Sequence, residues 1–287
     1  MKKILFIFLW LPCFFPTPTY AFTLSNFSSP ESVLVDPEDA SYYVSNVNGG
    51  VSNKDGNGYV SRISANGNTV IQKYFGDKKK EMLLHAPKGL AVLGKNIFVA
   101  DIDCVKGFNK ESGKPSVLVD FGKFAPKFLN DLASDAQGFL YVSDTLGNRI
   151  YQVNSKKDYE VTILKEGPEL EGPNGLMVNP KTKNLVVVTW GSGQILEVDH
   201  QGKVHTLKRG LGNLDGVDHD MDGNFYVSSY TKGEVYRIPN FGRGPLSTFL
   251  SGLNTPADIS VDRTKAELLI PSFDGNTVTT VSLKSKK

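Results

Sequence analysis

Short apolar runs, separated by turns rich in Gly, Asn and Asp, recur along most of the chain. Near residue 175 the pattern is an apolar strand, a turn, a second strand over residues 185–188, a tight Gly turn and two further strands. Apolar runs of this length between turn residues predict β-strands that pair as hairpins. Helical periodicity of useful length is missing from the sequence after residue 21, so the pattern predicts an all-β protein.

The same strand and turn unit returns six times. Each copy opens with Pro or Leu, then a mostly polar residue, a small or acidic residue and an aliphatic one; the copies start at Pro30, Pro87, Leu129, Pro173, Leu214 and Pro256. We call these four residues the tetrad. A period of about 40–45 residues with four short strands is typical of a β-propeller blade. The first step is longer because of an Asn-, Gly- and Ser-rich insertion at residues 47–57. Six copies predict a six-bladed β-propeller with four antiparallel strands per blade.

The last repeat is one strand short, because the chain ends soon after the predicted strand at residues 277–283. Residues 22–27 precede the first repeat and have no blade of their own. We expect this N-terminal segment to supply the missing outer strand and close the ring, which removes an unpaired sheet edge.

Residues 1–21 have the pattern of a secretory signal peptide. Lys2 and Lys3 precede an apolar run at residues 4–15, and Thr19 and Ala21 form a small-residue cleavage site. The run is too short for a membrane span, and a buried N-terminal helix is the alternative. The pattern predicts a periplasmic or secreted protein with no membrane attachment after cleavage. Residues 22–287 would form one propeller domain, expected to be a monomer.

Composition argues against some partners. The chain has 32 basic and 30 acidic residues, and loss of Lys2 and Lys3 would leave the mature protein neutral. Nucleic-acid binding depends on clustered basic residues, so we expect no nucleic-acid partner. The one basic run, at residues 78–80, is interpreted as a solvated loop. Cys104 is the single cysteine after residue 21, which excludes an intramolecular disulfide and indicates a packed thiol.

Candidate chemistry lies at the second position of the tetrad. Equivalent positions in radially arranged blades face one axis, so these six residues should surround one mouth of the central channel: Glu31, Lys88, Asn130, Asn174, Asp215 and Ala257. A structural turn would also favour Asn or Asp there. That alternative explains Asn174 and Asp215 but not Glu31 and Lys88, whose long charged chains are costly to bury unpaired.

Two carboxylates, Glu31 and Asp215, and two carboxamides, Asn130 and Asn174, make an all-oxygen ligand set. Hard divalent cations prefer such ligands. We therefore expect one bound divalent cation, calcium first, with magnesium, manganese or zinc as alternatives. The four His residues do not have metal-ligand spacing.

The chain resembles the SMP-30/gluconolactonase group of six-bladed propellers, which includes regucalcin-like lactonases and, more distantly, paraoxonases and strictosidine synthase-like proteins. The resemblance rests on Glu31 in Pro-Glu-Ser-Val, on the adjacent Asn130 and Asp131, on Asn174 in Pro-Asn-Gly-Leu and on Asp215 in Asp-Gly-Val. It implies that Glu31, Asn174 and Asp215 hold the catalytic ion, with Asn130 beside the ion and the substrate.

Two positions depart from that group. Phe128 stands where gluconolactonases commonly carry the Arg that grips the sugar, and Lys88 stands where paraoxonase-like members carry His. Phe128 and Lys88 are therefore candidate substrate contacts in an altered pocket. Residues 141–150 also resemble strands of NHL-repeat propellers, which are often binding scaffolds.

The resemblance predicts a metal-dependent lactonase, in which the ion polarises the carbonyl of a small-molecule lactone. Asp215 or Asp131 would help to deprotonate the attacking water. Lys88 has two interpretations: it orients the substrate or stabilises the oxyanion, or it pairs with Glu31 and Asp215 in place of a metal. The alternatives are a non-catalytic propeller that binds a ligand or protein on its channel face, and a lyase or synthase of the strictosidine type.

Overall fold

The computed structural model describes residues 20–76 and 82–284. Its strands form six four-stranded sheets. Blade 1 contains β2 (Pro30–Val35), β3 (Tyr42–Asn46), β4 (Tyr59–Ile63) and β5 (Val70–Phe75). Blade 2 contains β6 (Pro87–Leu93), β7 (Asn96–Asp101), β8 (Cys104–Asn109) and β9 (Pro115–Asp120). Blade 3 contains β10 (Leu129–Ser134), β11 (Phe139–Asp144), β12 (Arg149–Asn154) and β13 (Glu160–Glu166).

The second half of the ring repeats this order. Blade 4 contains β14 (Pro173–Val178), β15 (Leu185–Thr189), β16 (Ile195–Val198) and β17 (Val204–Lys208). Blade 5 contains β18 (Leu214–His219), β19 (Phe225–Ser229), β20 (Glu234–Ile238) and β21 (Ser247–Leu250). Blade 6 contains β22 (Ser260–Asp262), β23 (Glu267–Ser272), β24 (Thr277–Ser282) and β1 (Tyr20–Leu24). The protein is thus an all-β six-bladed propeller, and the prediction is confirmed.

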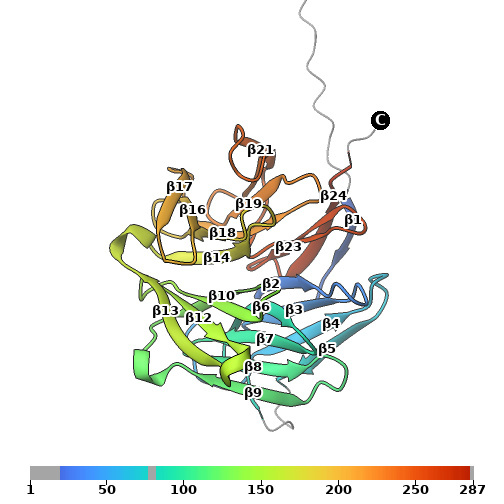
Figure 1. Ribbon diagram of the computed structural model, residues 1–287. Helices are drawn as coiled ribbons and strands as arrows, with labels where there is room; N and C mark the ends of the chain where they lie inside the picture. Colours follow the sequence, from blue (N-terminus) through green and yellow to red (C-terminus); the bar gives the residue numbers. More distant parts are fainter. Residues whose placement is uncertain (1–19, 77–81, 285–287) are drawn as a thin grey trace, which may run out of the picture.

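An N-terminal strand closes the ring, as expected. β1 pairs antiparallel with β24, with Phe22 opposite Thr280 and Leu24 opposite Val278, and the two strands lie side by side in Figure 1. β1 begins at Tyr20 rather than at the predicted residue 22, so the expected cleavage after Ala21 would shorten it. The remainder of the predicted signal peptide and the basic run at residues 78–80 lie outside the described residues.

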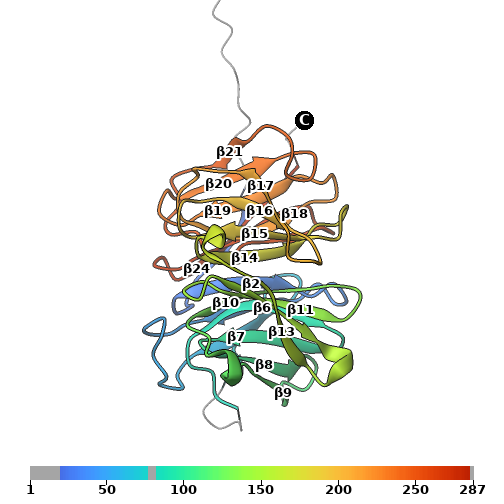
Figure 2. The ribbon, with the colours of Figure 1, turned by 60° about the vertical axis from the view of Figure 1, so that its left-hand side comes forward.

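The first strand of each blade lies at the centre of the ring, and the fourth lies at the outside (Figures 1 and 2). Apolar side chains fill the space between neighbouring sheets. One cluster joins Phe98 and Val119 of blade 2 to Leu132 and Tyr151 of blade 3. Because burial of apolar area is the main favourable term in folding, these interfaces between blades are the core.

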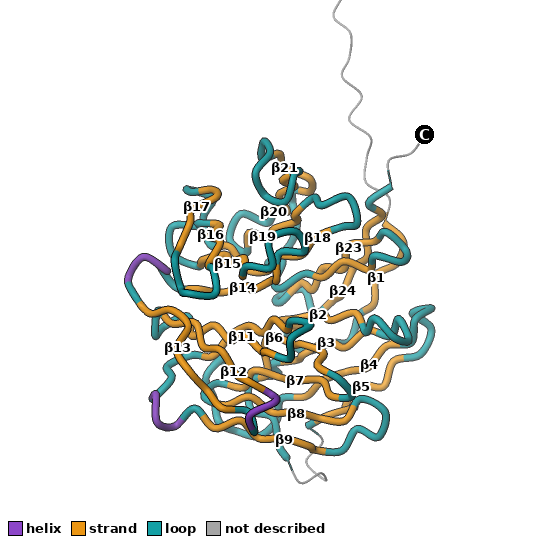
Figure 3. Tube along the Cα trace, in the orientation of Figure 1, coloured by secondary structure: helices purple, strands orange, loops and turns teal. Residues whose placement is uncertain are grey.

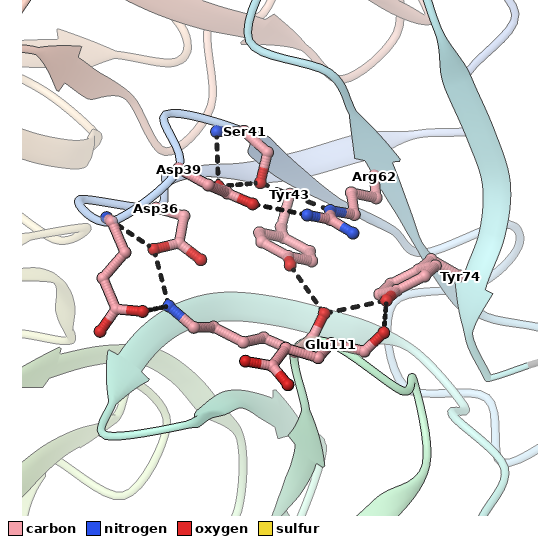
Figure 4. Close-up of polar contacts among 9 residues, drawn as sticks. Asp36, Asp39, Ser41, Tyr43, Arg62, Tyr74 and Glu111 are labelled. Atoms are coloured by element: carbon pink, nitrogen blue, oxygen red, sulfur yellow. Dashed lines mark hydrogen bonds and ion pairs between the residues drawn. The ribbon is translucent and has the colours of Figure 1, made fainter.

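Polar contacts add to the interface between blades 1 and 2 (Figure 4). The buried Lys110 ammonium forms an ion pair with Asp36 at 3.0 Å and with Glu38 at 2.6 Å. The Tyr43 and Tyr74 hydroxyls donate to the Lys110 carbonyl at 3.2 and 2.9 Å. The cluster therefore fixes the end of the β8 strand against blade 1.

Among the described residues, helix is confined to three single turns at Gly122–Phe124, Ser155–Lys157 and Pro168–Leu170, drawn purple in Figure 3. Over residues 20–76 and 82–284, the structure contains no helix that is long and apolar enough to cross a membrane.

The Cys104 thiol is packed, as the sequence indicates. Its Sγ lies 3.6 Å from the Asp101 carbonyl oxygen, and burial raises the pKa of the thiol to about 11. Because the thiolate is the reactive form, we expect alkylation by iodoacetamide at pH 8 to be more than tenfold slower than that of an ordinary cysteine. The rate should rise with each pH unit up to about pH 11. Rapid labelling at pH 8, measured by mass spectrometry, would contradict this expectation.

Candidate functional site

The second residues of five tetrads meet in one cavity. The cavity has a volume of about 460 Å³, which lies within the size range of small-molecule binding sites. Its polar floor is made of Glu31, Lys88, Asn130, Asn174 and Asp215. Ala257, the sixth member, is fully buried. The structure thus brings together the four predicted ligands and Lys88 at one end of the central channel.

A recurring irregularity in the innermost strands aims these side chains at the axis. In each of blades 1–5 the register with the second strand shifts between the first and fourth residues of the tetrad, for example between Leu129 and Leu132. A β-bulge of this kind leaves backbone groups unpaired and re-aims side chains. In three blades a Ser hydroxyl on the second strand accepts the free N–H, as Ser143 does from Asp131 at 2.8 Å.

Glu31 is buried and only partly satisfied. The residue is 9% exposed, and its Oε2 atom has no hydrogen-bond partner. Burial raises the pKa of the Glu31 carboxyl well above its usual value, and the nearby Asp215 and Asp258 carboxyls raise it further. A buried carboxyl oxygen without a partner is costly, so this atom is suited to meet a ligand.

The other polar groups of the floor form a hydrogen-bonded row. The Asn130 amide donates to Thr145 Oγ1 at 3.1 Å and to the Asn174 carboxamide oxygen. The Asn174 amide donates to the Leu214 carbonyl at 3.1 Å and to Asp215 Oδ1 at 3.4 Å. Burial, followed by the charge of Asp258, raises the pKa of Asp215 well above its usual value.

Lys88 lies in the same cavity but bonds to the backbone. Its Nζ donates to the Val51 and Ala86 carbonyls, both at 2.9 Å, and lies 4.4 Å from the centre of the Phe128 ring. Within the described part of the chain, Lys88 forms no direct ion pair with a carboxylate. Burial lowers the pKa of Lys88, opposed by the charge of Glu31. Lys88 therefore ties the loop that carries Val51 to blade 2 and holds Phe128 in the wall.

The structure separates Asp131 from the other candidates. Asn130 lines the site, whereas Asp131 lines a second cavity of about 430 Å³ farther along the innermost strands. Its Oδ2 accepts the Leu176 N–H at 2.6 Å, and burial raises the pKa of the carboxyl to about 7. The sequence led us to expect Asp131 beside the attacking water. Because Asp131 lines a different cavity, that expectation is wrong, and Asp215 is the carboxylate on the floor besides Glu31.

A second ring of residues was missed by the sequence reasoning. The ring consists of the residue directly after the second strand of each blade; these residues are Val47, Ile102, Thr145, Trp190, Tyr230 and Phe273. All except Ile102 line the cavity. The signal was present, because a mostly apolar residue recurs one or two positions after each predicted second strand, where a turn usually carries polar residues.

The oxygen ligands of the floor suit a hard cation, but only two of the four predicted ligands are carboxylates. Glu31 and Asp215 supply carboxylate oxygens, and Asn130 and Asn174 supply carboxamides whose oxygen and nitrogen ends exchange by rotation. The unpartnered Glu31 Oε2 is the observation that favours a cation there. Among the described residues, no group of three His, Cys, Asp or Glu side chains is placed to hold a metal. A cation at this floor would therefore depend on the carboxamides.

Comparison with solved structures supports the same architecture. A Bacteroides thetaiotaomicron protein of unknown function aligns with a TM-score of 0.70 and 16% identity, over 93% of this chain and 72% of the other. An inactive virginiamycin B lyase variant from Staphylococcus aureus, with quinupristin, aligns with a TM-score of 0.64 and 12% identity over 93% and 100%. A streptogramin B lyase structure gives 0.60 and 11% over 88% and 78%.

These likenesses define the class of the protein, a six-bladed β-propeller, and at such low identities they carry the fold alone. No protein-family model matches the sequence. No curated protein matches it either.

Proposed function

We propose that the protein is an exported, metal-dependent hydrolase that opens a lactone at the polar floor of the cavity. The observation that carries the proposal is the buried Glu31 Oε2 without a partner, next to Asp215 and two carboxamides. A resemblance to the SMP-30/gluconolactonase group at the tetrads supports the same assignment. Glu31, Asn130, Asn174 and Asp215 would hold one divalent cation, with calcium expected first.

When bound, the cation would act as a Lewis acid toward a carbonyl oxygen and compensate the charge of two buried carboxylates. Asp215 then has a carboxyl oxygen that can accept a proton from water at the floor. Asn130 is held by Thr145 and can orient the carbonyl group of a substrate. Lys88 keeps the wall in place through Val51 and Phe128, and acts as a positioning residue.

The proposal is tested on purified protein stripped with chelator and reloaded separately with calcium, magnesium, manganese or zinc. Each form is assayed on a panel of sugar, aromatic and alkyl lactones. We expect activity to vanish on stripping and to return with at least one ion. Activity that is unchanged by stripping, or hydrolysis with none of the ions on any lactone, would refute the metal-dependent hydrolase.

Replacement of Lys88 separates its two interpretations. Lys88→Met removes the bonds to Val51 and Ala86 but keeps an apolar chain against Phe128. We expect a several-fold rise in KM, because the wall at Val51 loosens, with ion binding retained. If Lys88 instead replaces a metal, the wild type should bind no ion, and Lys88→Met should lower stability by leaving Glu31 and Asp215 uncompensated.

A binding propeller without catalysis is the second candidate. The virginiamycin B lyase variant aligned above is inactivated by replacing one histidine with alanine, whereas no His is among the lining residues of this cavity. This argues against transferring that lyase chemistry to the present chain. Saturable ligand binding with no turnover under any ion would favour the binding propeller.

A further inference from the structure

The walls of the cavity differ chemically from its floor. Above blades 4–6 three aromatic side chains form an arc in which the Trp190 and Tyr230 ring centres are 5.4 Å apart, and those of Tyr230 and Phe273 are 6.2 Å apart. We call these three residues the aromatic arc. They line the same cavity as Asn174 and Asp215, so a molecule bound at the floor can contact them.

The backbone fixes the aromatic arc. Trp190 N donates to the Gly172 carbonyl at 2.8 Å, and Tyr230 N donates to the Asn213 carbonyl at 3.0 Å. The Asn213 amide in turn donates to the Trp190 carbonyl at 2.7 Å. These bonds join blades 4 and 5 at the rim, so the arc is built in advance of ligand binding, which lowers the entropy that binding must overcome.

The opposite wall is also apolar. Val47 and Val51 come from the insertion of blade 1, which Lys88 and His85 hold through Val51 O at 2.9 Å and the Gly56 N–H at 3.0 Å. Leu146, 63% exposed, extends the wall at blade 3. Val47, Val51 and Leu146 line the same cavity, and apolar side chains gathered on one exposed surface are typical of ligand-binding grooves.

Few donors remain on the walls. Lys88 is the cation among the lining residues, and its Nζ is engaged by two carbonyls and the Phe128 ring. Ser52 and Thr145 are the hydroxyls there besides Tyr230, and Thr145 already donates to the Pro173 carbonyl at 2.8 Å. A polyhydroxylated ligand would lose hydrogen bonds to water without replacing them at the walls, which disfavours its binding.

We propose that the site takes a lactone whose body is aromatic or alkyl rather than polyhydroxylated, with its ester group at the polar floor and its apolar body against the aromatic arc. This inference rests on the proposed hydrolase for the ester group, whereas the preference for an apolar body rests on the walls. Both walls would then be covered on binding, and the removal of their apolar area from water favours the complex.

The fluorescence of Trp190 can report binding at the aromatic arc, because Trp190 is the single tryptophan of residues 22–287; the other is Trp10. Metal-stripped protein, which the proposed function makes inactive, would be titrated with three six-membered lactones: dihydrocoumarin, δ-decanolactone and glucono-δ-lactone. We expect the first two to change the Trp190 fluorescence saturably, with dissociation constants at least tenfold lower than that of the third. Equal affinities, or no change with either apolar lactone, would overturn the inference.

Two variants test the assignment to the arc. Tyr230→Ala should weaken dihydrocoumarin binding at least fivefold, while Tyr230→Phe, which keeps the ring, should bind as the wild type does. Leu146→Ser, on the exposed rim, should weaken δ-decanolactone binding severalfold. This second variant keeps the test decisive if Tyr230→Ala folds poorly. Unchanged binding in both Tyr230→Ala and Leu146→Ser would place the ligand elsewhere and contradict the proposal.

The same titration separates the two proposals. Binding of the apolar lactones without turnover under any ion would refute the hydrolase and leave the apolar preference standing. Turnover of glucono-δ-lactone with no binding of the apolar lactones would support the hydrolase and refute the preference.

Discussion

Glu31→Gln should reduce the rate constant kcat/KM for lactone hydrolysis by about 100-fold or more and weaken ion binding by at least tenfold. The substitution nearly preserves shape but replaces a charged oxygen ligand by an amide. The structural reason is that Glu31 Oε2 is the buried atom of the floor that lacks a partner. The measurements are steady-state kinetics with saturating ion and calorimetric titration of the ion.

The stability of the ion-free protein separates a role of Glu31 as an ion ligand from a merely structural role. Because burial raises the pKa of Glu31 in the folded protein, its ionised form is destabilising above the pKa of the unfolded chain. In ion-free protein at pH 8, Glu31→Gln should therefore be as stable as the wild type or more stable. Glu160→Gln, on the exposed strand β13, is the matched control and should change neither property. Lower stability of the ion-free Glu31→Gln protein, with full activity, would contradict the account.

Gly175→Ala should destabilise the propeller by several kcal/mol, through the close approach of the innermost strands of blades 4 and 5. A Cβ at residue 175 would lie 2.2 Å from the Asp215 carbonyl oxygen and 2.9 Å from Gly216 Cα. Backbone atoms of a neighbouring blade cannot move aside as a flexible side chain can. Urea unfolding monitored by the fluorescence of Trp190 measures the loss.

The control separates steric effects from backbone strain. Gly94 has φ of +60°, and a Cβ there would meet no atom within 4 Å. Gly94→Ala should therefore cost only the left-handed backbone strain, about 1 kcal/mol. If Gly175→Ala is no more destabilising than Gly94→Ala, the innermost strands are not packed around the axis as described.

The repeat explains how much of the fold was predictable. The spacing of the tetrads predicts the six blades without any knowledge of side-chain contacts. The last repeat has one strand fewer than the others, so its fourth strand has to come from another part of the chain. The start of β1 could not be predicted, because the sequence around Tyr20 fits a signal-peptide cleavage site as well as it fits a strand. The register of β1 against β24, with Phe22 opposite Thr280, depends on tertiary contacts that the local sequence does not contain.

The site was predictable to the extent that it follows from symmetry. Equivalent tetrad positions face one axis, which placed Glu31, Asn174 and Asp215 correctly around one cavity. The direction of Asp131 depends on the bulge that follows Leu129, and the partners of Lys88 depend on the path of the insertion at residues 47–57. Both are set by long-range packing, so neither could be inferred from the tetrads alone.

The most direct test of the central claim is a calorimetric titration of calcium, magnesium, manganese and zinc, each separately, into chelator-stripped wild-type protein and into Glu31→Gln. The account predicts that at least one of these ions binds to the wild type at one ion per chain, and that the substitution abolishes or strongly weakens this binding. Wild-type protein that binds none of the four ions, or a Glu31→Gln protein that binds as tightly as the wild type, would contradict a metal site at the floor of the channel.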